Sequence, residues 1–336
     1  MNPRHRRLLI PGLLVALVVV VVVSSIAHRA EGAEKVDPPA RAVSTIDDPR
    51  LGEASGMAVS RAHDDLVYVV NDSGNAPEVF AVRVSTGDVV GVTTVQGVTW
   101  RDTEAMAIAA DGTLWVADTG DNLRRRDDVA LYALHEPGPG DHVVSATRYP
   151  VSFPDGPEDV EALLLDPRDE RFTLVSKGLV AGEFYRLPTT LEASTPNRAE
   201  RVDGRAPGVV TDGAFTADGK HVLLRTYGTV QEYSSGDLAS ERVLAVPAQQ
   251  QGETLAIERG DRSFLIGSEG SPSPLVRVAV PPATTPSASP STAATPSPAS
   301  ADDPTEGATD RTAWWVGGAI AAAVASALLV AGLRRR

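Results

Sequence analysis

One short pattern returns five times along this chain, and it constrains the fold more than any other feature. A hydroxyl or acidic residue leads into a short apolar strand, and 14 to 17 residues later an Asp, Ser or Thr is followed by any residue and then Gly. Repetition every 40 to 57 residues indicates stacked or circular β repeats. The first halves begin at Ser55, Glu104, Glu161, Asp212 and Glu253, and the second halves at Asp72, Asp118, Ser176, Thr226 and Ser268.

Each repeat predicts one four-stranded antiparallel sheet. In the second repeat, apolar strands are expected at 105–109, 114–117, 129–134 and 143–151, with a tight-turn signal at Asp111 and Gly112. The fifth repeat has three strands, and 42–46 precedes the first repeat in the right place to supply its outer strand. The sequence therefore predicts an all-β, five-bladed β-propeller over 41–280 that an N-terminal outer strand closes. Six blades and a β-sandwich are the alternatives.

Both ends of the chain differ from this core. Arg4, Arg6 and Arg7 precede an uncharged run, which predicts a signal peptide over 1–27, with an uncleaved membrane anchor as the alternative. Residues 281–312 are rich in Pro, Ser, Thr and Ala, which predicts a disordered stalk.

The uncharged segment 314–333 is long enough to span a bilayer, and the basic tail 334–336 is expected on the cytoplasmic side. These features predict a secreted, single-pass protein of the cell membrane with an extracellular propeller and a cytoplasmic C-terminus.

Composition excludes several kinds of chemistry. The chain has no Cys, so disulfides, thiol nucleophiles and thiolate metal sites are ruled out. Its net charge of −13 disfavours nucleic acid as a partner and favours cations. The sequence has no Gly-x-Ser-x-Gly motif of a serine hydrolase, and its six His show no metal-binding spacing.

Carboxylates are expected to crowd one mouth of the propeller channel. Residues two apart on a strand point the same way, so the residue two before each repeat start shares its face. The predicted ligand-binding residues at this mouth are Glu53, Asp102, Glu104, Asp159, Glu161, Asp212 and Glu253, with Lys177 and Arg225 as nearby bases.

Repulsion among these carboxylates must be offset by protonation, by a base, or by calcium or another divalent cation. In the alternative interpretation, the acids bind backbone amides and Arg side chains and fix the packing of the blades. The candidate metal ligands are Glu104, Glu161, Asp212, Glu253, Asp72 and Asp118.

The stretches that begin at Glu53, Glu104 and Thr211 resemble secreted actinobacterial β-propellers of WD40/NHL-like repeat architecture. More distantly, they are similar to the phytase-like (esterase-like) β-propeller family. That resemblance implies a propeller fold and calcium that receives phosphate. It makes cation ligands of Asp102, Glu104, Glu161, Asp212 and Glu253. The chain departs from such enzymes in having few Lys near the mouth, which weakens the case for a phosphatase.

Two functions of different classes follow from these features. The anchor, the stalk and the absence of a nucleophile motif favour a non-catalytic module on the cell surface that binds an extracellular ligand or protein. The alternative is a cation-dependent hydrolase that uses the acidic channel mouth, a phytase-like phosphoesterase or, less favoured, a glycosidase.

Overall fold

The computed structural model describes residues 33–281, which form five β-sheets. The first blade contains β3 (Ala54–Val59), β4 (Leu66–Asn71), β5 (Glu78–Arg83) and β6 (Val89–Gln96). The second contains β7 (Thr103–Ile108), β8 (Thr113–Asp118), β9 (Ala130–His135) and β11 (Thr147–Ser152). The third contains β12 (Val160–Leu165), β13 (Phe172–Ser176), β14 (Ala181–Arg186) and β16 (Glu200–Pro207).

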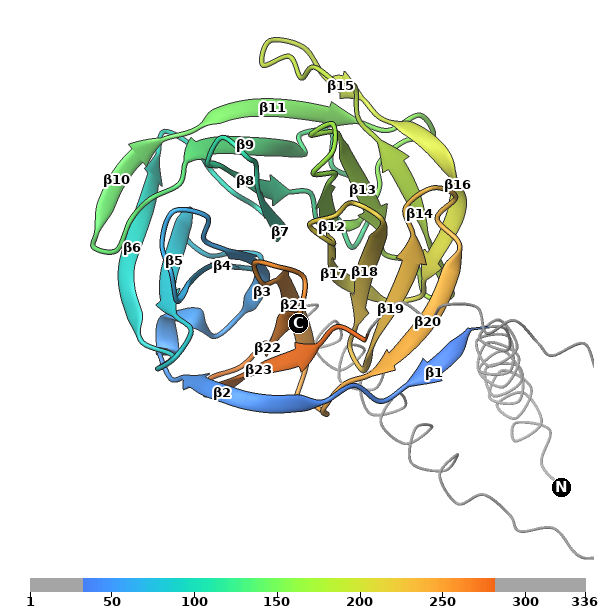
Figure 1. The fold of residues 1–336 in the computed structure, drawn as a ribbon. Helices are drawn as coiled ribbons and strands as arrows, with labels where there is room; N and C mark the ends of the chain where they lie inside the picture. Colours follow the sequence, from blue (N-terminus) through green and yellow to red (C-terminus); the bar gives the residue numbers. More distant parts are fainter. Residues whose placement is uncertain (1–32, 282–336) are drawn as a thin grey trace, which may run out of the picture. The chain divides into compact units, whose positions relative to one another are not determined.

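The fourth blade contains β17 (Val210–Phe215), β18 (His221–Thr226), β19 (Thr229–Ser234) and β20 (Ser240–Ala245). The fifth contains β21 (Gly252–Ile257), β22 (Ser263–Ser268), β23 (Ser273–Ala279) and β2 (Ala40–Ile46). The innermost strands are neighbours in the order β3, β7, β12, β17, β21 and back to β3, so the sheets surround one axis (Figure 1). The prediction of an all-β, five-bladed propeller is confirmed for the described residues.

The ring is closed by a strand from the N-terminal side. β2 pairs antiparallel with β23, and Ala42 lies opposite Val276. The 3₁₀-helix η1 (Pro49–Leu51) then leads towards β3. The predicted outer strand at 42–46 therefore completes the fifth blade, and closure removes the free sheet edges that a linear array would leave.

Three blades carry an extra edge strand that the sequence did not predict. β10 (His142–Ser145) pairs in parallel with β6, β15 (Asn197–Arg198) with β11, and β1 (Glu34–Val36) with β20. In each case a short segment covers the edge of one blade before the chain enters the outer strand of the next. The predicted single strand at 143–151 was wrong for this reason: its first half belongs to the first blade and its second half to the second.

The core consists of one apolar cluster at each blade–blade interface. In β4, Leu66 and Tyr68 pack towards the second blade, whereas Val67 and Val69 pack towards the fifth. Side chains alternate between the two faces of a strand, so each central strand buries both faces. The same arrangement of five interfaces sets the inner strands close together and fixes the positions of the side chains at their ends.

Within residues 33–281, no helix is long and apolar enough to cross a membrane. The predicted signal peptide, stalk and membrane span lie outside the described residues.

Candidate functional site

Every innermost strand has a break in its pairing near its first residues. In the first blade Ala54 lies opposite Asn71 and Gly56 opposite Val70, so Ser55 is an extra residue, a β-bulge. A bulge re-aims the side chain that it contains. The same shift falls at Glu104, Glu161 and Thr211, and in the fifth blade it spans Glu253 and Thr254.

The pairing corrects the sequence alignment of the fourth repeat by one residue. Thr211, not Asp212, is the equivalent of Glu104. Asp212 is fully buried, and its carboxylate accepts hydrogen bonds from the amides of Gly213 and Leu255, each at 2.7 Å. Burial raises the pKa of Asp212 well above its usual range. Asp212 thus joins β17 to β21 and does not line the mouth.

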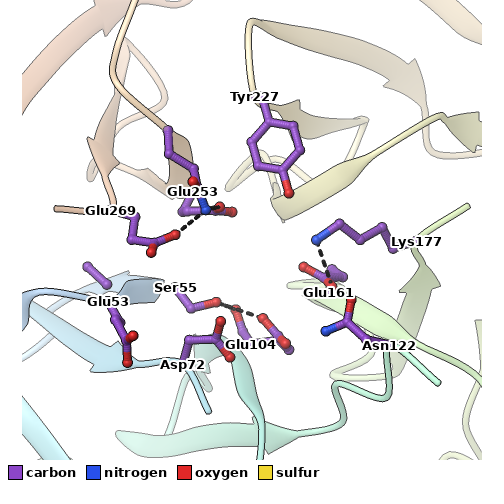
Figure 2. A pocket seen from close by; sticks show the side chains of 12 residues that line it. Glu53, Ser55, Asp72, Glu104, Asn122, Glu161, Lys177, Tyr227, Glu253 and Glu269 are labelled. Atoms are coloured by element: carbon purple, nitrogen blue, oxygen red, sulfur yellow. Dashed lines mark hydrogen bonds and ion pairs between the residues drawn. The ribbon is translucent and has the colours of Figure 1, made fainter. Parts of the chain in front are cut away.

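A polar depression opens where the bulged residues gather (Figure 2). It is lined by Glu53, Ala54, Ser55, Asp72, Glu104, Asn122, Glu161, Lys177, Tyr227, Gln251, Glu253 and Glu269. The structure therefore brings together five of the residues that the sequence placed here for ligand binding: Glu53, Glu104, Glu161, Lys177 and Glu253. A role for them in binding a ligand stays a prediction.

On one side of the mouth, Asp72, Asp102 and Glu104 form a cluster that we call the acid triad. One carboxylate oxygen from each lies within 4.8 Å of the others. Ser55 Oγ donates to Glu104 Oε2 at 2.8 Å. A Cβ at Gly120 would lie only 2.2 Å from Glu104 Oε1, so the triad can close up only because that residue is glycine.

Burial and neighbouring carboxylates disfavour the ionised form of two members of the acid triad. Burial, and then the neighbouring Asp72, raise the pKa of Asp102 to about 8. Burial and the charge of Glu161 raise the pKa of Glu104 well above its usual range. Within the described residues, Asp102 Oδ1 is buried without a hydrogen-bond partner. Carboxylate and hydroxyl oxygens are the ligands that hard divalent cations take, so this donor set fits calcium or magnesium.

The only cationic side chain that lines the mouth in residues 33–281 is Lys177. Its Nζ lies 3.0 Å from Glu161 Oε1 and 5.5 Å from the centre of the Tyr227 ring. Burial by itself would lower the pKa of Lys177, but the negative charge of Glu161 and the Tyr227 hydroxyl more than offset this, and the pKa is raised. Figure 2 shows Tyr227 across the opening from Asp72.

Two further carboxyls near Lys177 titrate close to neutral pH. Burial raises the pKa of Glu161 to about 8 and that of Glu253 to about 7, although the Lys177 charge acts in the opposite direction on both. Gln251 Nε2 donates to Glu253 Oε1 at 2.8 Å and holds this side chain in place. The mouth therefore contains a permanent cation beside groups that can exchange a proton at pH 7.

Three predicted site residues lie behind the mouth. Asp118 is buried, and it binds Arg126 Nη2 and the amide of Asp102, each at 2.9 Å. Asp159 accepts a hydrogen bond from the amide of Asp121 at 2.8 Å. These two carboxylates have the structural contacts that the alternative interpretation of the acids described.

Arg225 is the third of these residues, and it is fully buried. Its Nη2 donates to Gln249, while Nε and Nη1 have no hydrogen-bond partner within residues 33–281. Burial lowers the pKa of Arg225 to about 10. A Cβ at Gly252 would lie 2.2 Å from Arg225 Nη2, so the guanidinium packs directly against the inner strand of the fifth blade.

Sequence reasoning missed Tyr227 and Glu269, although both stand in the repeated motif. Each is the variable middle residue of that motif. Each is equivalent to Lys177, because it directly follows the last residue of the second strand of its blade. Asp72 occupies this same position, one residue after Asn71, the true equivalent of Asp118. The register of strand pairing identifies these equivalent positions, whereas a comparison of residue types along the sequence does not.

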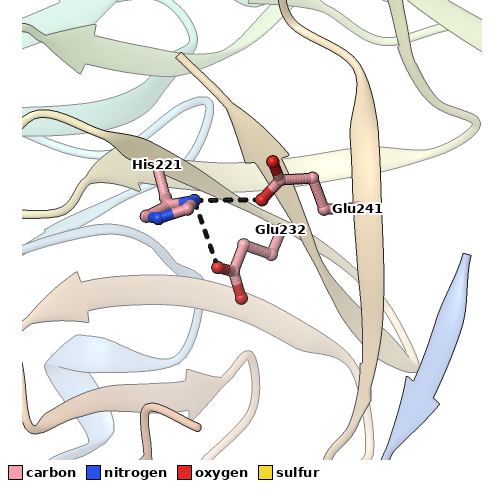
Figure 3. Close-up of side chains that lie close together, drawn as sticks. All are labelled: His221, Glu232 and Glu241. Carbon is pink, nitrogen blue, oxygen red and sulfur yellow. Dashed lines mark hydrogen bonds and ion pairs between the residues drawn. The ribbon is translucent and has the colours of Figure 1, made fainter. Parts of the chain in front are cut away.

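A second cluster of possible metal ligands lies on the fourth blade (Figure 3). His221 Nδ1 lies 3.3 Å from Glu232 Oε1 and 3.1 Å from Glu241 Oε2. Glu232 is buried, and Arg242 binds both of its oxygens, with Nη2 at 2.7 Å and 2.6 Å. We call His221, Glu232 and Glu241 the paired cluster, because a guanidinium already compensates its buried carboxylate.

Comparison of the fold finds similar solved structures at low sequence identity. A calcium-binding protein, regucalcin, from Agrobacterium tumefaciens is 13% identical, with 74% of this chain and 97% of that chain covered at a TM-score of 0.45. A gluconolactonase from Xanthomonas campestris is 12% identical, with 73% and 87% covered at 0.45. Glutaminyl cyclase from Myxococcus xanthus is 11% identical, with 73% and 99% covered at 0.46. No protein-family profile and no curated protein matches the sequence.

These neighbours correct one prediction and leave another open. Two of the three are enzymes by name, contrary to the prediction of a non-catalytic binding module. The narrower resemblance to phytase-like, WD40/NHL or actinobacterial propellers stays a prediction. At these identities the likeness shows the fold alone, so the chemistry of this chain has to be argued from its own residues.

Proposed function

We propose that this chain is a divalent-cation-dependent hydrolase that cleaves a neutral carboxylic ester at the acidic channel mouth. One observation carries the proposal. Two members of the acid triad, Asp72 and Glu104, line the same pocket as Lys177, a half-buried cation, and Glu253, a buried carboxyl whose pKa is raised to about 7. Perturbed titratable groups that share a cleft with a metal-binding donor set are typical of an active site.

Asp72, Asp102 and Glu104 would hold the cation. Their fit rests on the buried Asp102 Oδ1 that lacks a partner and on the raised pKa of two of the three carboxyls, because a cation would remove their mutual repulsion. A bound divalent cation supplies positive charge that polarises a substrate oxygen. Ser55 orients Glu104 through its hydrogen bond.

Glu253 and Lys177 supply the remaining chemistry. Hydrolysis adds water across the acyl C–O bond and gives an acid and an alcohol, so one proton leaves the attacking water and one reaches the leaving oxygen. Glu253, with a pKa of about 7, can take the first proton and return it. Lys177 stays protonated, so it acts as a fixed positive charge beside the oxygen on which negative charge develops.

The charge of the pocket favours a neutral ester over the other hydrolase substrates. Six carboxylates line it: Glu53, Asp72, Glu104, Glu161, Glu253 and Glu269. Against these stands one lysine, so a phosphoester dianion would be repelled unless several cations were bound. Tyr227 is the only aromatic side chain that lines the described pocket, which leaves little surface on which a sugar ring could stack.

Turnover of simple substrates tests this proposal. The purified protein, with added calcium, is assayed on p-nitrophenyl acetate, p-nitrophenyl phosphate and a p-nitrophenyl glycoside. We expect hydrolysis of the acetate ester that a chelator abolishes and that Glu253→Gln lowers strongly. Hydrolysis of the phosphate alone would replace the ester by a phytase-like phosphoesterase, and no turnover of any of the three would contradict the hydrolase proposal.

We also propose that the propeller is displayed outside a membrane. The support is the uncharged segment 314–333, followed by the basic residues 334–336 and preceded by the Pro- and Ser-rich segment 281–312. Protease treatment of intact cells should release the propeller, and it should leave a membrane-associated C-terminal fragment. Recovery of the full-length protein in the soluble fraction would contradict this topology.

A further inference from the structure

Four of the five large exposed apolar side chains of residues 33–281 lie on loops beside the mouth. Leu179 is 82% exposed and Leu123 is 71% exposed, and Val180 and Tyr227 are each 38% exposed. Within residues 33–281 the only other large hydrophobic residue with comparable exposure is Val143, which lies on β10 at the outer edge of the first blade. Apolar side chains in water at a functional opening need an explanation, because a contiguous exposed patch marks a binding surface.

The apolar residues stand next to the residues that line the pocket. Leu123 follows Asn122, Leu179 comes two residues after Lys177, and Tyr227 itself lines the pocket. All lie on the three loops that leave the second strands of the second, third and fourth blades. We call Leu123, Leu179 and Val180 the apolar rim. Tyr227, on the loop of the fourth blade, is partly exposed and lines the polar pocket.

Contacts between loops hold the apolar rim in place. Arg124, next to Leu123, donates from Nη2 to the carbonyl of Lys177 at 3.3 Å, and its Nη1 lies 3.2 Å from Glu158 Oε2. Behind Leu179, the backbone of Gly208 packs so closely that a Cβ there would lie 2.6 Å from the Leu179 carbonyl oxygen. The exposure of the rim is therefore a property of loops that are tied to one another and to the blades.

The part of the mouth formed by the first and fifth blades is acidic. On the first and fifth blades, the mouth is bordered by Glu53, Asp72 and Glu269, and Asn75 Nδ2 donates to Glu53 Oε2 at 2.7 Å. A ligand that crosses this mouth would meet carboxylates on one side and hydrocarbon on the other. The site is therefore suited to a molecule with a polar, reactive end and an apolar chain.

We infer that the substrate is an ester with an apolar chain, whose ester group lies in the pocket while the chain extends over Leu123, Leu179 and Val180. The inference rests on the proposed hydrolase function and names its substrate class. Removal of hydrocarbon from water drives such binding in proportion to the area covered. A rim open on one side covers about half of each methylene, so kcat/KM should rise roughly twofold per added methylene.

The test compares p-nitrophenyl acetate with p-nitrophenyl octanoate, each with added calcium, in the wild type and in a Leu123→Ser, Leu179→Ser variant. Both leucines are exposed, so the variant should fold. We expect the octanoate-to-acetate ratio of kcat/KM to exceed about 10 in the wild type and to fall several-fold in the variant. Val143→Ser, which changes an equally exposed residue far from the mouth, should leave the ratio unchanged. A ratio that is the same in the wild type and in the leucine variant would overturn the inference.

Binding of octanamide, a neutral analogue that is a poor substrate, separates this inference from the proposed function. Calorimetry with the calcium-loaded protein should show tighter binding of octanamide than of acetamide, and the leucine variant should lose that difference. If octanamide binds in this way while no ester is hydrolysed, the rim is supported and the ester hydrolase fails. If esters are hydrolysed without any preference for chain length, or if the rim instead mediates a dimer that the variant dissolves, the substrate inference fails alone.

Discussion

The acid triad at the mouth and the paired cluster on the fourth blade each bring three candidate ligand atoms within 4.8 Å of one another. They differ in how their charge is compensated. Arg242 binds both oxygens of Glu232 in the paired cluster, whereas Asp102 Oδ1 of the triad has no hydrogen-bond partner in the described chain.

This difference shows that convergence of acidic side chains does not by itself make a cation site. A buried carboxylate that is paired with a guanidinium has little to gain from a metal ion, because the ion pair already offsets the free-energy cost of its desolvation. A buried carboxylate whose pKa is raised by neighbouring carboxylates has more to gain. A cation at the acid triad would remove the repulsion among Asp72, Asp102 and Glu104, and this relief would favour its binding.

The largest expected effect is on turnover. Glu104→Gln keeps the shape of the side chain but removes one charge of the triad, so ester hydrolysis should fall on the order of 100-fold or more. The matched change in the paired cluster, Glu241→Gln, should leave kcat/KM within a factor of two. Equal losses in the two variants would erase the distinction between the clusters.

Arg242→Met tests whether Arg242 compensates the charge of the paired cluster. It leaves the carboxylate of Glu232 buried and without its guanidinium, which should lower the free energy of unfolding by about 3–5 kcal/mol. Urea denaturation at pH 7 measures the loss, and addition of Glu232→Leu should recover most of it. A loss below about 1 kcal/mol would show that Arg242 is not the compensating charge.

Calcium should stabilise the wild type through the triad. A ligand at about 100 times its dissociation constant adds about 2.7 kcal/mol to the stability of a protein that binds it only when folded. The melting temperature should therefore rise with calcium in the wild type and in Glu241→Gln, and it should rise much less in Glu104→Gln. A shift of equal size in all three proteins would place the ion elsewhere.

Without added cation, the stability of the protein should fall as the pH rises from about 5 to 8. Burial raises the pKa of Glu161 to about 8 and of Glu253 to about 7, so the folded state keeps protons that the unfolded chain has already released. Each retained proton makes the free energy of unfolding decrease by at most about 1.4 kcal/mol per pH unit. Glu161→Gln should flatten this slope, and a stability that rises with pH over this range would contradict the assignment.

The smallest effect is expected at the exposed edge of the paired cluster. Glu241 is partly exposed, and its contact with His221 resembles a surface ion pair, which contributes between zero and about 1 kcal/mol. Thermal unfolding of Glu241→Gln should therefore match that of the wild type closely. A larger loss would mean that the paired cluster depends on Glu241 as well as on Arg242.

Much of the fold could be predicted because the blade motif repeats. Apolar alternation and turn signals identified the strands of five blades, and the leftover strand at 42–46 identified the closure. The extra edge strands could not be predicted in the same way. A pattern of apolar residues indicates which face of a strand is buried, but it does not indicate which neighbour the strand pairs with, so the run at 143–151 concealed two strands in different blades.

The candidate site could be predicted only in part. Charge at the strand ends pointed to Glu104, Glu161 and Lys177, which share the pocket. Asp212 was misplaced because a match of residue types cannot detect a bulge, and a shift of one residue turns a side chain from the mouth into the interior. The perturbed pKa of Glu253 and the exposure of the apolar rim could not be predicted at all, because both depend on burial, which the sequence does not display.

A crystal structure of the calcium-loaded protein tests the central claim most directly. Uncompensated repulsion among Asp72, Asp102 and Glu104 predicts an ion bound to these carboxylates at about 2.3–2.6 Å from their oxygens, and none at His221, Glu232 and Glu241. An empty triad at saturating calcium, or an ion at the paired cluster instead, would contradict the account.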